Sequence, residues 1–236
     1  MILPSMMTRT DLPDQIQAVL FDLDGTLMDT DDQAVENLAH RLRRLRWPHP
    51  DRTARRLVMT AETPGNLVLS LLDVLGLDEL AMSLTRPMRQ RPGSDFRIVA
   101  GVAEMLAQLN GRYRLAIVTT RGQEEASAFL AQHHLEETFE TVVTRESTRR
   151  LKPHPAPVQH AARLLDVPVE RCVMVGDTVV DVQSARRAGA WTVAVLCGFG
   201  ERRELERARA HLILEQTAHL ASHLLPLGHN NDDETR

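Results

Sequence analysis

The sequence predicts an α/β fold whose core is a doubly wound parallel sheet. Short, nearly continuous apolar runs rich in Val and Ile recur along the chain, which is typical of strands that helices cover on both faces. Segments with helical periodicity separate the later runs, and this alternation indicates parallel strands joined by crossover helices. One long stretch near the N-terminus contains only helical patterns, so we also expect a small α-helical domain inserted into the core.

Five apolar runs are expected to form the sheet, and four helical segments are expected to lie between or beside them. The predicted strands are residues 16–21, 114–118, 141–143, 172–175 and 192–196. The predicted helices are residues 102–109, 123–133, 156–165 and 181–188. Ligands of such sheets bind beyond the carboxyl ends of the strands, so we expect a functional site among the residues that follow each strand.

The inserted stretch is expected to form a helical cap over that edge of the sheet. It contains a basic amphipathic pattern over residues 34–45, an apolar run over residues 67–75 and a third helical pattern over residues 80–91. The alternative is a set of long crossover helices in one domain, but roughly 60 residues far exceed an ordinary connection. The predicted boundaries are 14–29 and 94–228 for the core, 30–93 for the cap, and 1–13 and 229–236 for loose termini.

Composition argues against several kinds of partner. The 28 basic and 32 acidic residues give a net charge of −4, and aromatic residues are only 3% of the chain, so we expect no nucleic-acid or anionic-membrane partner. No apolar run approaches the roughly 18 residues of a membrane span, and residues 1–15 lack an apolar stretch of the signal-peptide type. These observations predict a cytoplasmic protein.

Two aspartates directly follow the first predicted strand. The segment FDLDGTLMDT, residues 21–30, puts Asp22 and Asp24 at the strand end, where residues two apart point the same way, and Gly25 lets the chain turn away. Two carboxylates this close repel each other, and Mg²⁺ relieves such repulsion because it prefers oxygen ligands. A polar strand end followed by turn residues is the alternative interpretation of this segment.

The fourth predicted strand also ends in acidic residues. It leads into VGDTVVD, residues 175–181, which puts Asp177 at the strand end and Asp181 at the start of the next helix. Asp181 could instead be a helix-capping or first-turn residue that the helix dipole stabilises. Carboxylates that follow two strands of one parallel sheet converge on the same edge and favour a metal site there.

Two further segments could bind an anion at this edge. Thr119 and Thr120 end the second predicted strand, where a hydroxyl could donate to a phosphate oxygen or could cap the following helix. Lys152, in the segment LKPHP, could neutralise substrate charge before a helix that begins with proline. A surface lysine is the alternative for Lys152.

Together these segments resemble the motif set of the haloacid dehalogenase-like (HAD) hydrolase superfamily. That set is DxDGTL, a strand-terminal Thr, Lys-Pro and GDxxxD, and the resemblance extends from about residue 16 to residue 223. KPHP, GDTVVDVQSARRAGAWTVAVLCGFG and the position of the insert look like the phosphoglycolate phosphatase-like group. The resemblance implies a Rossmann-like core with a helical cap and a Mg²⁺-dependent hydrolase of a small phosphorylated metabolite, as a monomer or homodimer.

The resemblance also implies roles for the four aspartates. Asp22 would be the nucleophile that forms an aspartyl-phosphate, and it would bind Mg²⁺. Asp24 would be the general acid and base and would bind the metal through its backbone carbonyl. Asp177 would bind Mg²⁺ directly, and Asp181 would support the metal through a water molecule or by contacting the direct ligands.

The remaining site residues include two departures from the usual motif. Thr119 and Lys152 would hold the transferring phosphoryl group. Relatives commonly have Asn after the motif threonine, whereas this chain has Thr120, and Arg121 then adds a positive charge. We expect Thr120 and Arg121 to contact the substrate and Arg121 to influence which substrate is preferred.

Several functions share these motifs. A sugar-phosphate mutase of the β-phosphoglucomutase type uses the same core residues, and a pyrophosphatase is also compatible with them. A catalytically silent binding module on the same fold is the alternative from outside enzymology, because fold does not imply function. Such a module would be expected to have lost one of Asp22, Asp24, Lys152 or Asp177, and all of them are present.

Overall fold

The computed structural model describes residues 12–13, 15–29, 40, 42–44 and 96–225 of the chain. The described residues cover nearly all of the predicted core. The predicted cap and termini lie outside the described residues, apart from 12–13, 40 and 42–44. No helix within the described ranges is long and apolar enough to cross a membrane.

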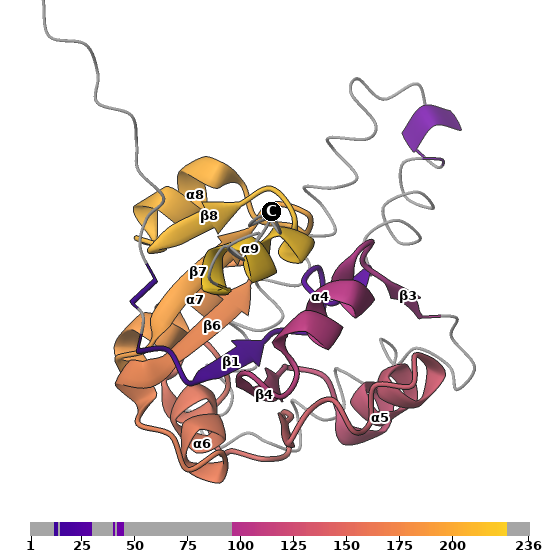
Figure 1. Cartoon of the computed structure of the whole chain (residues 1–236). Helices are drawn as coiled ribbons and strands as arrows, with labels where there is room; N and C mark the ends of the chain where they lie inside the picture. The colour runs from indigo at the N-terminus through magenta and orange to yellow at the C-terminus, as the bar shows by residue number, and fades with distance from the viewer. Residues whose placement is uncertain (1–11, 14, 30–39, 41, 45–95, 226–236) are drawn as a thin grey trace, which may run out of the picture.

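Six parallel strands form the central sheet in the order β5-β4-β1-β6-β7-β8 (Figure 1). Their bounds are β1 Ala18–Phe21, β4 Arg114–Val118, β5 Thr141–Val143, β6 Cys172–Gly176, β7 Trp191–Val195 and β8 Leu212–Leu214. The chain adds β4 and β5 on one side of β1 and then returns to add the other strands on the opposite side. The order therefore reverses beside β1, where open α/β sheets bind their ligands.

Helices cover both faces of this sheet. Among the described residues they are α4 Val102–Leu109, α5 Gln123–Gln132, α6 Ala156–Leu164, α7 Val179–Ala188, α8 Arg202–Arg207 and α9 Leu220–Leu224, with short 3-10 turns η2 Val169–Arg171 and η3 Thr217–His219. Apolar residues of α4, α5 and α9 pack on one face, and those of α6 and α7 pack on the other. The described core is thus a three-layer sandwich with the sheet in the middle.

The side chains of β1 show why its sequence is continuously apolar. Val19 and Phe21 belong to the cluster under α4 and α5, whereas Ala18 and Leu20 belong to the cluster under α6 and α7. All four are fully buried, because alternate residues of a strand point to opposite faces and both faces are covered here. The continuous apolar runs of the sequence predicted this packing on both faces, and the structure confirms the doubly wound fold class.

The five predicted strands and four predicted helices are all present, with ends that differ by at most two residues. Three strands were not predicted. Edge strand β8 has only three residues, and β2 Met28–Asp29 pairs with β3 Arg97–Ile98 in a separate two-stranded antiparallel ribbon. Segments of two or three residues are too short to show a hydrophobic period, and β3 is not buried.

Candidate active site

The eight predicted site residues follow β1, β4 or β6 or lie in the loop before α6. They are Asp22, Asp24, Thr119, Thr120, Arg121, Lys152, Asp177 and Asp181. Because β1 lies between β4 and β6, the ends of these three strands are neighbours in the sheet. The topology therefore brings residues from four separate motifs to one edge.

Asp22 is the first residue after β1, and the sheet fixes its backbone. Its N–H donates to the carbonyl of Val175 in β6 at 2.8 Å, which continues the strand pairing by one residue. The residue is buried, with 7% of its surface exposed. A carboxylate in such a place needs charged or polar partners, because burial without them is costly.

Lys152 is the principal partner of Asp22. Its Nζ donates to Asp22 Oδ1 and to Asp181 Oδ1, both at 2.6 Å, and to the carbonyl of Val118 at 2.9 Å. Three acceptors match the three donors of an ammonium group. With 3% of its surface exposed, Lys152 is a buried member of the site and not the surface lysine of the alternative interpretation.

The charge of Lys152 is stabilised by its neighbours. Burial alone would lower the pKa of Lys152, but the charges of Asp181 and Asp22 and the hydrogen bonds from both outweigh burial and raise the pKa above its usual range. The ammonium therefore remains charged at neutral pH. It provides a fixed positive charge at the end of β1.

Asp177 follows β6 and lies in a tight cradle of backbone. It is fully buried, and its Oδ2 accepts a hydrogen bond from the N–H of Phe199 at 2.7 Å. A Cβ added at Gly25 would come within 2.4 Å of Oδ2, and one added at Gly198 within 2.2 Å. These glycines leave just enough space for the carboxylate, so the surrounding loops fix its position.

Asp181 has a structural role and a site role at once. It lies in the first turn of α7, where its Oδ2 accepts from the N–H and the hydroxyl of Thr178 at 3.1 and 2.5 Å. This is the capping arrangement that was the alternative interpretation of this residue. Its Oδ1 binds Lys152, so the helix terminus holds Asp181 in place beside Asp22.

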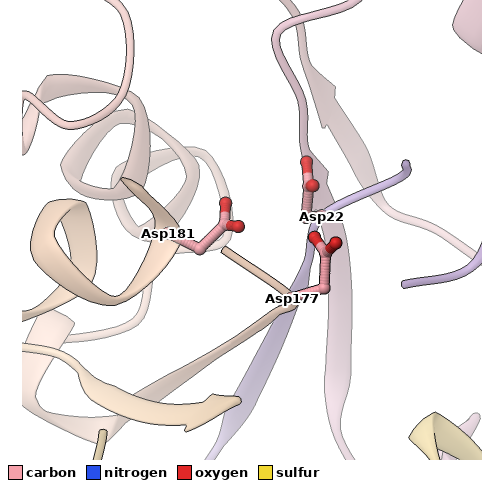
Figure 2. Close-up of side chains that lie close together, drawn as sticks. All are labelled: Asp22, Asp177 and Asp181. Carbon is pink, nitrogen blue, oxygen red and sulfur yellow. The ribbon is translucent and has the colours of Figure 1, made fainter. Parts of the chain in front are cut away.

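Asp22, Asp177 and Asp181 form a cluster that fits a divalent cation. They come from three different elements, and each offers a carboxylate oxygen within 4.8 Å of the others (Figure 2). All three are buried. Oxygen ligands from carboxylates suit hard cations such as Mg²⁺. The donor chemistry and the tight placement of Asp177 both fit such an ion.

Electrostatics favours a cation here as well. Burial raises the pKa of Asp22 from 3.8 to about 7; Lys152 opposes this shift, and the charges of Asp181 and Asp24 add to it. One ammonium therefore does not fully compensate the buried carboxylates. A divalent cation would supply the missing positive charge and would hold Asp22 in its ionised form.

The loop after β4 places the other predicted residues. The hydroxyl oxygen of Thr119 accepts a hydrogen bond from the N–H of Arg121 at 3.0 Å. This bond uses a lone pair of the oxygen and does not involve the hydroxyl hydrogen. Thr119 is buried and Thr120 is half-buried. The guanidinium of Arg121 binds the carboxylate of Asp24, with a shortest N–O distance of 2.6 Å. The sequence did not predict this ion pair.

The sequence also did not predict that the loop after β7 contacts Asp177. Gly198 approaches Asp177, and Phe199 donates to it. The segment CGFG, residues 197–200, was a usable signal, because two glycines directly after a strand often mark a close approach of backbone to a functional group.

The fold and the site define a class of doubly wound α/β proteins that carry an acidic, lysine-containing site at the carboxyl edge of a parallel sheet. The sequence profile of the haloacid dehalogenase-like hydrolases matches residues 19–195, and the chain belongs to that family. Enzymes of this family generally use a divalent metal ion.

Individual proteins are similar to this chain in sequence or in fold. The chain is 31% identical over 215 residues to pyrophosphatase PpaX of Bacillus cereus, covering 90% of this chain and 96% of that one. A hydrolase from Pseudomonas syringae is 27% identical with a TM-score of 0.63, covering 88% and 97%. CbbY from Rhodobacter sphaeroides, solved with xylulose-1,5-bisphosphate, is 24% identical with a TM-score of 0.60, covering 87% and 96%.

Proposed function

We propose that this hydrolase is a Mg²⁺-dependent phosphatase that removes the phosphoryl group of a small phosphorylated metabolite through an aspartyl-phosphate on Asp22. The observation that carries the proposal is the buried contact of Asp22 with Lys152 inside the cluster of Asp22, Asp177 and Asp181. A nucleophile needs a fixed, ionised carboxylate, and the cluster together with a cation provides it. We expect the enzyme to act in the cytoplasm as a monomer or homodimer, without a nucleic-acid or membrane partner.

The reaction has two steps in this proposal. In the first, an oxygen of Asp22 attacks phosphorus, the P–O bond to the leaving group breaks, and Asp24 gives a proton to the leaving alkoxide. In the second, Asp24 takes a proton from water, the water oxygen attacks phosphorus, and the acyl phosphate bond to Asp22 breaks. The sum is ester plus water giving alcohol plus phosphate, with Asp22 and Asp24 regenerated.

Other residues of the chain stabilise charge during both steps. When bound, Mg²⁺ would be held by Asp22, Asp177 and the backbone carbonyl of Asp24, with Asp181 in support, and would neutralise charge on phosphoryl oxygens. Lys152 carries a permanent charge beside Asp22, and the hydroxyl of Thr119 can donate to a phosphoryl oxygen. We propose that Thr120 and Arg121 contact the substrate next to these groups.

The test is phosphate release from a panel of phosphomonoesters and pyrophosphate, with Mg²⁺ and with EDTA. We expect release that requires Mg²⁺ and that falls below detection in Asp22→Asn, which keeps the shape of the side chain but not its nucleophilic charge. Asp166→Asn, at an exposed position, is the control for a general effect of the substitution. Full activity of purified, folded Asp22→Asn would overturn the proposed mechanism.

A pyrophosphatase is the second candidate, because the chain is 31% identical to pyrophosphatase PpaX over most of both proteins. The same chemistry applies with phosphate as the leaving group, and the panel includes this substrate. A mutase would instead return an isomeric sugar phosphate without net phosphate release. A silent module would neither bind Mg²⁺ nor release phosphate.

A further inference from the structure

Arg121 covers the carboxylate that is proposed to act as acid and base. Its Nε lies 2.9 and 2.7 Å from the two oxygens of Asp24, and its Nη2 lies 2.6 Å from Oδ1. One guanidinium thus engages both oxygens in charge-assisted hydrogen bonds, which are among the stronger ones in proteins. While this contact lasts, a leaving-group oxygen or a water has to compete with Arg121 for Asp24.

Two hydrogen bonds hold the backbone of Arg121, so a change in this contact requires movement of a side chain. Its N–H donates to the hydroxyl of Thr119 at 3.0 Å, and its carbonyl accepts from the N–H of Arg145 at 3.1 Å. On the other side of the guanidinium, Glu125 Oε1 lies 3.8 Å from Nη1. The guanidinium of Arg121 therefore lies between two carboxylates, those of Asp24 and Glu125.

The pair lies where a substrate can reach it. The side chains of Arg121 and Asp24 are 14% and 20% exposed, whereas that of Lys152 is only 3% exposed. The planar fork of a guanidinium binds a phosphate or a second carboxylate as well as it binds Asp24. A ligand with an anionic group at this position can take over the contact, so that the charge of Arg121 stays paired when Asp24 is released.

We propose that Arg121 is a positioning residue for Asp24, and that the substrate is selected by its ability to break the contact between the two side chains. In the free enzyme the guanidinium of Arg121 is paired with Asp24, which keeps Asp24 from acting as acid or base. When a substrate binds whose leaving group carries a second anionic group, that group binds the guanidinium and Asp24 is released. This inference rests on the proposed phosphatase function and deepens it. It assigns the substrate to phosphoryl compounds whose leaving group carries a carboxylate or a phosphate.

The experiment compares substrates that differ only in this second charge. Phosphoglycolate is paired with 2-hydroxyethyl phosphate, and ethane-1,2-diol bisphosphate is paired with 2-methoxyethyl phosphate, so that every leaving group is an alkoxide. We expect the wild type to favour the anionic member of at least one pair by about tenfold or more in kcat/KM, since a site built around a polar contact rejects a substrate that lacks it. The pair with the larger preference tells whether the group is a carboxylate or a phosphate.

Substitutions then separate positioning from a merely structural role. In Arg121→Gln we expect kcat/KM to fall about tenfold or more for the anionic substrate, whereas kcat for the neutral substrate should rise because Asp24 is no longer held. Arg121→Lys keeps the charge without the fork and should lie between the two. Arg145→Gln is the matched control, because Arg145 is an exposed arginine of a neighbouring loop that pairs with Glu146.

Binding supplies a measurement that does not depend on turnover. In the Asp22→Asn background, calorimetry should show weaker binding of phosphoglycolate or ethane-1,2-diol bisphosphate after Arg121→Gln, with a smaller change for the neutral partner. An equal loss for both members of a pair, in rate and in binding, would overturn the role of Arg121 and leave the phosphatase proposal intact. A wild type that neither binds Mg²⁺ nor releases phosphate from any substrate would overturn both.

Discussion

Asp22 is a buried carboxyl group among like charges, and its protonation has consequences for stability. Its pKa is about 7 in the folded protein against an ordinary value of 3.8, because burial outweighs the opposing charge of Lys152. Between these pH values the folded protein binds more protons than the unfolded chain, so stability falls as pH rises. The contribution of Asp22 is present below the unfolded pKa and is lost as pH rises through the folded one.

We therefore expect the melting temperature of the metal-free protein to fall between about pH 5 and pH 8 in EDTA, and to fall less in Asp22→Asn. Thermal unfolding across this pH range measures both slopes. Asp166→Asn, at an exposed position, should behave as the wild type does. A wild-type slope of the opposite sign, or equal slopes in Asp22→Asn, would contradict the assignment to Asp22.

Asp24 is expected to act in both steps, so its loss should trap the enzyme between them. In Asp24→Asn we expect turnover to fall about 10²- to 10⁴-fold, which is the usual contribution of general acid–base catalysis. With a substrate whose leaving group needs no proton, a covalent phosphoenzyme should accumulate and be detectable by mass spectrometry of the quenched enzyme. Finding no phosphoenzyme under these conditions would argue against the proposed role of Asp24.

At the scale of residues, the sequence indicated which residues lie at the sheet edge but not which side chains contact one another, and the roles of these residues stay predictions. The strand ends identified Asp22 and Asp177, because an acidic residue that directly follows a buried strand lies at the sheet edge where such folds bind their ligands. The burial of Lys152 and the pairing of Arg121 with Asp24 were not predictable in this way. Both depend on side chains that are far apart in sequence and whose directions only the folded chain defines.

Two glycine positions allow a test of how loops hold the metal site. Gly25 and Gly111 have similar left-handed backbones, with φ of 66° and 75°. A Cβ at Gly25 would lie 2.4 Å from Asp177 Oδ2, whereas a Cβ at Gly111 would meet nothing within 4 Å. The same alanine substitution therefore adds backbone strain at both positions but displaces a carboxylate at only one.

We expect Gly25→Ala and Gly111→Ala each to lose about 1–2 kcal/mol of stability from the left-handed backbone. Only Gly25→Ala should also weaken Mg²⁺ binding, because Asp177 has to move. Unfolding by denaturant and calorimetric titration with Mg²⁺ measure the two effects separately. If both variants bind Mg²⁺ as tightly as the wild type, Asp177 is not held by this turn in the way the geometry indicates.

At the level of elements, length decided what the sequence could predict. Strands such as β1 and β6 are long enough to show continuous burial on two faces. Helix α7 begins at Val179, two residues before its predicted start, because its N-cap is Thr178. The ribbon of β2 and β3 pairs segments about 70 residues apart, and each has only two residues. Neither segment shows a period, so only tertiary pairing defines them.

The whole molecule explains why four separate motifs form one site. Because the strand order reverses beside β1, the residues after β1, β4 and β6 become neighbours although more than 150 positions separate Asp22 from Asp177 in the chain. The alternation of strands and helices was sufficient to predict this architecture. The cap that was predicted for residues 30–93 remains a prediction, and with it the identity of the residues that would select the substrate beside Arg121.

Metal binding should couple this site to the stability of the whole core, because Asp22, Asp177 and Asp181 come from different parts of the sheet edge and are brought together only by folding. A ligand that binds only the folded state adds about 2.7 kcal/mol to the free energy of unfolding when its free concentration is 100 times its Kd. For a chain of this size that corresponds to a rise in Tm of about 5 to 10 °C.

We expect Mg²⁺ to raise Tm in this way, with a magnitude that follows the calorimetric Kd, and we expect Asp177→Asn to abolish the rise. Substitution of an exposed acidic residue, Asp166→Asn, should leave the rise intact, which separates specific binding from a general effect of ionic strength. A rise that is equal in Asp177→Asn, or that NaCl of the same ionic strength reproduces, would mean that the cluster does not hold the ion. Because stability is measured without substrate, this result tests the metal site even if the physiological substrate is not in the panel.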